Sequence, residues 1–197
     1  GQNGLWSFLI KNSFRPNLIG AHFNGIVSNT PWLSMSKLSS NPYKQELSRI
    51  AKYYNIKPSG SSFLHLEMAT IFLIHSVDKF LMHKAAFGCI LPETVLSGKH
   101  HEEFRVGHYR KGEIPFEMGI TEIWNLPVDT FKNRAIAIFG RKENIPRLGK
   151  FTGKTIESSR EFIEKDFNVF TGHNRTVWSQ SELSDKHGVF DAYDFEQ

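Results

Sequence analysis

Four consecutive residues, Asn29-Thr30-Pro31-Trp32, combine groups that could hold and orient an amine. The amide oxygen of Asn29 can accept one hydrogen bond from an amino group. The carbonyl of Thr30 can accept a second, because Pro31 restricts the residue before it to an extended conformation. Trp32 adds a flat aromatic face, so this arrangement could bind the exocyclic amino group of a nucleobase. An ordinary strand-ending turn is the alternative interpretation.

Other residues with chemical potential form weaker patterns. His100, His101, Glu102 and Glu103 are adjacent and do not share a helix face, so we expect a solvated helix surface and no metal site. Cys89 lies in an apolar run, and we expect an inert core residue. A loose basic series is expected to be solvated surface, with contact to nucleic-acid phosphates as the alternative. This series comprises Arg141, Lys142, Arg147, Lys150 and Lys154.

The surrounding sequence predicts the elements of an α/β sheet. Residues 23–28 form a short apolar run typical of a buried strand, which Pro31 terminates. Residues 66–80 carry apolar side chains at spacings of three and four, which predicts a helix that Ser61 or Ser62 could cap. Residues 85–91 are a fully apolar strand. A helix followed by a buried strand indicates a parallel sheet, with the four residues at its carboxyl edge.

The remaining predicted elements extend this core. Residues 42–54 form a helix and residues 93–105 one or two short helical pieces. Residues 119–126 and 135–140 form an antiparallel hairpin at a sheet edge. Beyond Lys142 the composition turns polar, and residues 159–167 have the amphipathic pattern of a helix.

Composition excludes several classes of protein. The 197 residues include 40% hydrophobic and 22% charged residues, which is typical of a globular chain with a real core. The net charge of +4 comes without a dense basic block, so a histone-like tail is excluded. One cysteine excludes a disulfide framework. Ionisable residues interrupt the apolar stretch 63–82, so we expect a cytoplasmic protein without a membrane partner.

In order and in kind, these segments resemble the amino-methylating DNA methyltransferases, especially the adenine-specific enzymes of restriction-modification systems. Their catalytic motif, Asp/Asn/Ser-Pro-Pro-Tyr/Phe/Trp, stands here as Asn29-Thr30-Pro31-Trp32. Residues 67–81 are similar to their amphipathic helix, residues 87–92 to the strand that follows it, and residues 131–142 to their closing hairpin. The resemblance covers roughly residues 5–145.

The resemblance implies a fold class and a division of the chain. The fold would be α/β, a partial Rossmann-like methyltransferase sheet with a closing antiparallel hairpin. Residues 1–145 would be the C-terminal part of a catalytic domain, and residues 146–197 a polar extension that starts a target-recognition or linker region.

The resemblance also implies an activity. A methyl group would pass from S-adenosylmethionine to the amino group of an adenine flipped out of double-stranded DNA, with cytosine as the alternative base. Asn29 and the Thr30 carbonyl would orient the amine, Pro31 would shape the turn, Trp32 would stack on the base, and Phe131 would form a second aromatic wall. The alternative is that Trp32 is a core residue and that Phe131 only packs within the hairpin. Other subunits or domains of a restriction-modification system would be further partners.

Two departures from the family pattern qualify this interpretation. Thr30 replaces the first proline of the motif. The family's glycine-rich turn and acidic residue, which bind S-adenosylmethionine, are missing from the 28 residues before Asn29, and no such turn follows Trp32. We therefore expect a fragment that lacks its cofactor-binding half and is inactive alone. The alternative is a non-catalytic module that binds nucleic acid or a partner.

Overall fold

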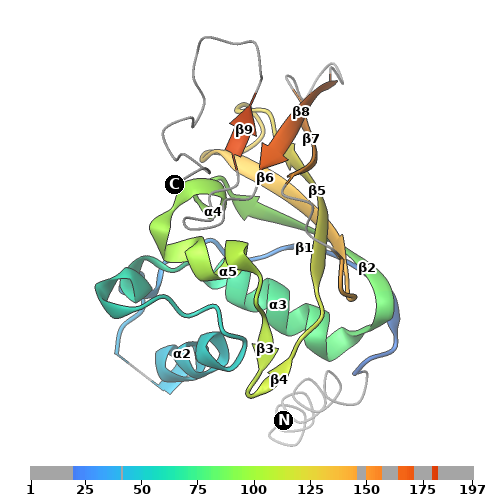
Figure 1. Ribbon diagram of the computed structural model, residues 1–197. Coiled ribbons are helices and arrows are strands. Elements are labelled where there is room, and N and C mark those ends of the chain that lie inside the picture. The colour runs from blue at the N-terminus through green and yellow to red at the C-terminus, as the bar shows by residue number, and fades with distance from the viewer. Residues whose placement is uncertain (1–19, 41, 146–149, 157–163, 171–178, 182–197) are drawn as a thin grey trace, which may run out of the picture.

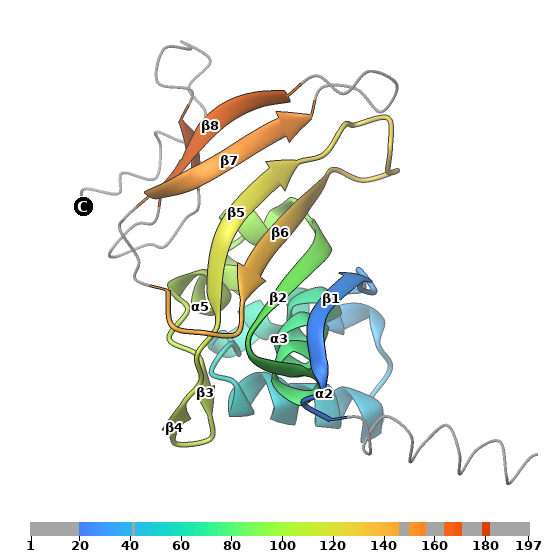
Figure 2. The same cartoon turned by 90° about the vertical axis from the view of Figure 1, so that its right-hand side faces the viewer.

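The computed structural model describes residues 20–40, 42–145, 150–156, 164–170 and 179–181. Their strands form a seven-stranded sheet in the order β1-β2-β6-β5-β7-β8-β9 (Figures 1 and 2) and a separate two-stranded hairpin, β3-β4. The principal strands are β1 (Phe23–Asn29), β2 (Leu81–Pro92), β5 (Gly119–Asn125), β6 (Ala135–Arg141), β7 (Lys150–Ile156), β8 (Glu164–Phe170) and β9 (Ser179–Ser181). The hairpin is made of β3 (Arg110–Lys111) and β4 (Ile114–Pro115).

Two helices connect β1 to β2 and build the core. They are α2 (Pro42–Tyr53) and α3 (Met68–Phe80), with short 3-10 helices at Met35–Lys37 and Gly60–His65. Strands β1 and β2 are parallel, with Val27 opposite Gly88 and Asn29 opposite Ile90, so the chain must cross over between them. Helix α3 makes this crossover and packs on both strands, while α2 packs against α3.

An antiparallel hairpin, β5 and β6, continues the sheet beyond β2. Strand β6 pairs with β2, with Cys89 opposite Ile138, and β5 pairs with β6. A methyl group on Gly140 would collide with the carbonyl of Gly119 and the ring of Phe87, so only glycine fits where these strands approach closely. The predicted fold class, an α/β Rossmann-like methyltransferase sheet with a closing hairpin, is confirmed.

Short helical pieces follow β2, as the sequence predicts. They are α4 (Thr94–Ser97), a 3-10 turn at Lys99–His101 and α5 (Glu102–Val106). No helix in the described part of the chain has the length and apolar character needed to cross a bilayer.

Four local predictions are wrong. The hairpin of β5 and β6 does not lie at a sheet edge, because β6 pairs with β2 on one side and β5 pairs with β7 on the other. Helix α3 is preceded by Glu67 rather than capped by Ser61 or Ser62, because residues 60–65 form a separate 3-10 helix. Strand β1 is not buried, since it lies at the edge of the sheet and Val27 is 94% exposed. Residues 164–167 belong to strand β8 rather than a helix, because Phe167 pairs opposite Gly153 in the sheet. Residues 159–163 lie outside the described residues.

The polar C-terminal region contributes strands to the same sheet. Strand β7 pairs in parallel with β5, with Trp124 opposite Lys154, and β8 pairs with β7. The role of residues 146–197 as the start of a recognition or linker region stays a prediction.

Candidate base-binding site

The four residues of the motif lie at the carboxyl ends of the two parallel strands. Asn29 is the last residue of β1 and is exposed, next to Ile90 of β2. Thr30 is buried directly after it, at 6% exposure. In open α/β sheets, ligands bind beyond the carboxyl ends of the strands, so the motif stands where such a sheet places its active site.

Thr30 ties the motif to the core through its side chain. Its hydroxyl Oγ1 donates to the carbonyl oxygen of Ala69 in α3 at 3.4 Å and lies 3.8 Å from the Sγ of Cys89 in β2. The residue that replaces the family's first proline therefore anchors the turn by polar contacts. Cys89 is 2% exposed, and burial raises the pKa of its thiol to about 11, which agrees with an inert core residue.

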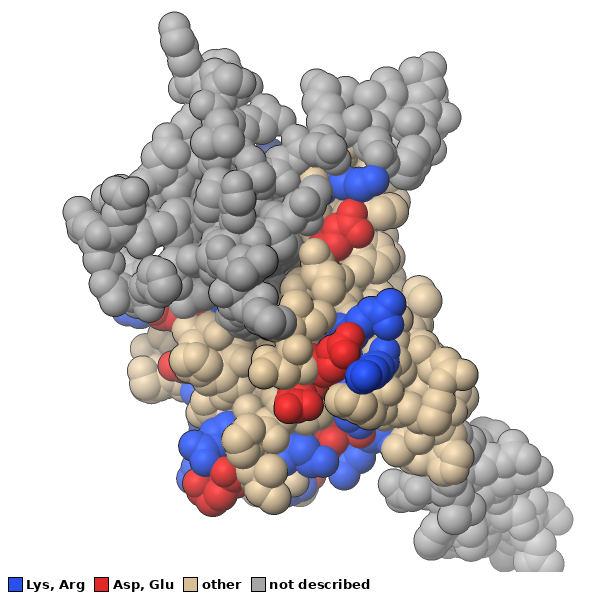
Figure 3. Space-filling model, turned by 45° about the vertical axis from the view of Figure 1, so that its right-hand side comes forward, with Lys and Arg blue, Asp and Glu red and all other residues tan. Residues whose placement is uncertain are grey.

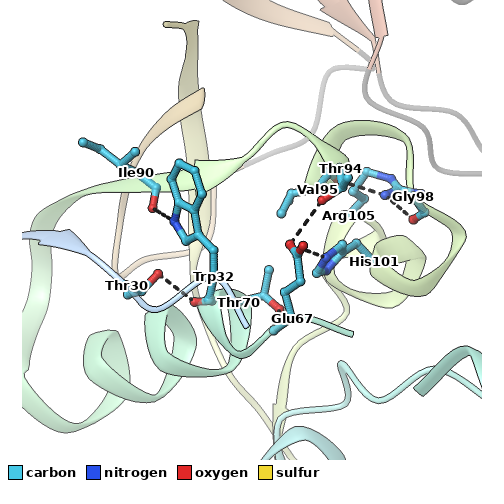
Figure 4. A network of polar contacts seen from close by, with 11 residues as sticks. Thr30, Trp32, Glu67, Thr70, Ile90, Thr94, Val95, Gly98, His101 and Arg105 are labelled. Carbon is cyan, nitrogen blue, oxygen red and sulfur yellow. Dashed lines mark hydrogen bonds and ion pairs between the residues drawn. The ribbon is translucent and has the colours of Figure 1, made fainter. Parts of the chain in front are cut away.

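Trp32 is held in place by the neighbouring strand. Its indole Nε1 donates to the carbonyl oxygen of Ile90 at 3.3 Å (Figure 4), and its ring is half-buried. The ring of Phe131, from the loop between β5 and β6, packs against Trp32 with the centroids 5.4 Å apart and the planes at 40°. The structure thus brings together the two aromatic residues that the sequence singled out.

Glu67 joins the motif to the turn after β2, which the sequence did not predict. Its backbone pairs with Ser34 in an isolated antiparallel bridge, while Met35 N–H donates to the Leu66 carbonyl and Met68 N–H to the Leu33 carbonyl. Its carboxylate accepts a hydrogen bond from Thr94 Oγ1 at 3.1 Å (Figure 4). An acidic residue just before a helix is the one signal that sequence inspection could have used.

His101 and Arg105 complete this network behind Glu67. His101 is fully buried, with Nε2 3.5 Å from Oε2 of Glu67, so the prediction of a solvated surface at this position is wrong. Burial lowers the pKa of His101 and favours the neutral ring. Arg105 is 1% exposed and donates from Nη1 to the carbonyl oxygens of Val95 and Gly98, both at 2.8 Å, which fixes the turn beside Thr94 (Figure 4).

Two residues of the predicted basic series form hydrogen bonds to backbone carbonyls within the protein. Lys142 donates from Nζ to the carbonyls of Asp78 and Leu81, and Arg141 donates from Nη1 to the carbonyl of Lys84. On the face in Figure 3, Lys and Arg side chains lie beside Asp and Glu side chains and form no single basic field. Among the described residues, no group of three His, Cys, Asp or Glu side chains is placed to hold a metal ion. Arg147 lies outside the described residues.

Comparison with known proteins relates this fold to restriction-modification enzymes. The chain is similar to the type IIG restriction endonuclease BpuSI, with a TM-score of 0.53 and 14% identity over 80% of this chain and 20% of that one. It is similar to the ATP-dependent type ISP restriction-modification enzyme LlaBIII bound to DNA, with a TM-score of 0.50 and 10% identity over 83% of this chain and 14% of that one. A DrdV–DNA complex also matches, with a TM-score of 0.50 and 12% identity over 78% and 18% of the two chains.

These likenesses show the fold. The chain spans a fifth or less of the length of each of these structures. No family model matches the sequence, and no curated protein is similar to it at the level of sequence.

Proposed function

We propose that this chain, whose fold is shared with restriction-modification enzymes, is the substrate-facing part of a DNA methyltransferase that modifies the amino group of adenine. The observation that carries the proposal is the placement of Asn29-Thr30-Pro31-Trp32 beyond the carboxyl end of β1, with the ring of Trp32 fixed by Ile90 and packed against Phe131. The partners of the complete enzyme would be double-stranded DNA and other restriction-modification subunits or domains.

Each residue of the motif has a distinct role in this proposal. The exposed Asn29 amide oxygen and the Thr30 carbonyl accept the two amino hydrogens, which directs the nitrogen lone pair toward the methyl donor. Pro31 holds the Thr30 peptide in its extended shape. Trp32 stacks on the base, which returns about 1–3 kcal/mol toward the few kcal/mol that flipping the base out of the duplex costs. Phe131 lies against Trp32 from the hairpin loop and so borders the position of the base.

The methyl donor would be S-adenosylmethionine, which supplies an electrophilic methyl group. The described residues contain no glycine-rich strand-to-helix turn for it, so we place its site in another part of the complete enzyme. Among the described strands β1 lies at the edge of the sheet, and Val27 is 94% and Phe23 43% exposed, although parallel strands are normally covered on both faces. We place the cofactor-binding part of the complete enzyme beside the carboxyl end of β1, next to the motif.

The test is Asn29→Ala in the complete enzyme that contains this chain, with Asn24→Ala as the matched control. Asn24 is an exposed asparagine of the same strand, away from its carboxyl end. We expect Asn29→Ala to slow methyl transfer to adenine-containing duplex by roughly a hundredfold, the effect of removing one group that acts in the transition state. Asn24→Ala should keep the wild-type rate. Near wild-type transfer by Asn29→Ala would show that the motif has been misassigned.

The target base needs a separate measurement. Duplexes that contain adenine but no cytosine, and the reverse, should be compared as methyl acceptors for the complete enzyme. We expect transfer to the adenine-containing duplex only. Transfer to cytosine would leave the proposed roles of the motif residues unchanged but would identify cytosine as the target base.

A further inference from the structure

The two aromatic residues of the site are held in very different ways. Trp32 is fixed to the sheet, because its Nε1 donates to the Ile90 carbonyl in β2 and the preceding Thr30 is anchored to α3. Phe131 belongs to the loop of residues 126–134, most of whose side chains are exposed. Of the two rings, Phe131 is therefore the one that can move at low cost.

The loop is fastened at its two ends. Leu126 N–H donates to the Ala135 carbonyl, and Glu93 N–H donates to the Arg134 carbonyl. Within the loop, Thr130 N–H donates to the Pro127 carbonyl, and Val128 is 72% exposed beside this turn. The ion pair between Arg134 and Glu93 is long, at 3.7 Å, and 72% of the Arg134 side chain is exposed, so it adds little.

The spacing of the rings leaves no room for a base between them. Their centroids are 5.4 Å apart and their planes are inclined at 40°, which is direct aromatic contact. A base sandwiched between two parallel rings requires the rings to be about 7 Å apart, twice the carbon–carbon contact distance of about 3.5 Å. In this structure Phe131 therefore occupies space that a sandwiched base would need.

We propose that Phe131 is a cover for the stacking face of Trp32, which an incoming base displaces before it can bind. This inference rests on the proposed function, because it assumes that Trp32 stacks on a base. It assigns the ring of Phe131, which the loop of residues 126–134 carries, a role in access to the site. The ligand is a planar purine, and the contact between the rings is the interaction that the purine replaces.

Whether Phe131→Ala strengthens or weakens binding of a base distinguishes a cover from a fixed wall. The probe is 2-aminopurine 2′-deoxyriboside, titrated into the 197-residue chain, with quenching of its fluorescence as the measure of stacking. Phe131→Ala removes the cover, so we expect it to bind the probe roughly two- to tenfold more tightly than the wild type, as the loss of one aromatic pair allows. Val128→Ala, in the same loop, controls for general loosening and should bind like the wild type.

The other outcomes are equally decisive. Weaker binding by Phe131→Ala would show that the ring is a fixed wall, which overturns the cover and leaves the proposed function standing. Tighter binding by Val128→Ala to the same extent would also overturn it, since loop flexibility alone would explain the gain. Absence of quenching with both the wild type and Phe131→Ala, up to the solubility of the probe, would overturn it as well. Unchanged binding by Trp32→Ala would instead contradict the stacking role in the proposed function.

Discussion

Asp78 carries a buried negative charge on which the stability of the chain depends. It lies near the end of α3, and its side chain is 4% exposed. Tyr54 donates its hydroxyl to Oδ2 at 2.7 Å, and Lys111 in β3 donates to Oδ1 at 2.8 Å. Burial alone would raise the pKa of Asp78, but the hydrogen bonds from Lys111 and Tyr54 and the charges of Lys111 and Lys142 lower it below 3.8. The folded protein therefore favours the charged form.

Asp78→Asn should lower the free energy of unfolding by about 2–3 kcal/mol. A hydrogen bond to a charged group contributes about 1.5–3 kcal/mol, and the amide keeps only one of the two acceptor oxygens while its NH₂ group would face Lys111 or Tyr54. The loss stays below that of two full bonds, because the Lys111 side chain is 39% exposed and can turn toward water.

Glu46→Gln is the matched control, because it makes the same chemical change in an exposed pair. Glu46 and Arg49 are 2.6 Å apart, with 49% and 67% of their side chains exposed. Such a surface pair contributes little, so we expect Glu46→Gln to unfold at the same urea concentration as the wild type. Urea denaturation of both variants and the wild type at neutral pH measures the difference. Equal stabilities of Asp78→Asn and Glu46→Gln would refute the argument.

The pH dependence provides an independent check of the same reasoning. Because the pKa of Asp78 is depressed on folding, its contribution is complete above the unfolded value of about 3.8 and is lost as the pH falls through the folded value. The difference in free energy of unfolding between the wild type and Asp78→Asn should therefore become smaller in strong acid. A difference that does not change with pH would show that Asp78→Asn destabilises the protein through packing rather than through loss of charge.

Three further predictions concern the site and its surroundings. Thr30→Val removes the hydroxyl that reaches Ala69 but keeps the backbone carbonyl, so it should lower the free energy of unfolding in urea by about 1 kcal/mol; wild-type stability would show that this hydroxyl does not anchor the turn. Burial and the neighbouring His101 lower the pKa of His100 from 6.5 to about 4, so the free energy of unfolding should fall as the pH drops from 6.5 toward 4. His100→Gln should make this pH dependence shallower, and an unchanged profile would contradict the assignment. Calorimetry with S-adenosylmethionine should detect no tight binding by this chain, and micromolar binding would contradict a separate cofactor-binding half.

Elements with strong local signals could be predicted from the sequence. The apolar spacing of α3, the apolar run of β2 and the paired strands β5 and β6 all appear where the sequence places them. These patterns are reliable because each element buries one face or both faces in the same core. The start of α3 was missed, because the Ser-rich segment before it forms its own 3-10 helix rather than a cap.

The sequence alone determined the motif, its position after a strand and the α/β class, because these depend on residue type and short spacing. Only the tertiary structure decided that β1 is an exposed edge, that Thr30 is anchored by Ala69, and that Phe131 packs on Trp32. It also decided that Glu67, Thr94 and His101 meet behind the motif. Contacts between distant segments depend on strand order and side-chain direction, which local periodicity does not encode.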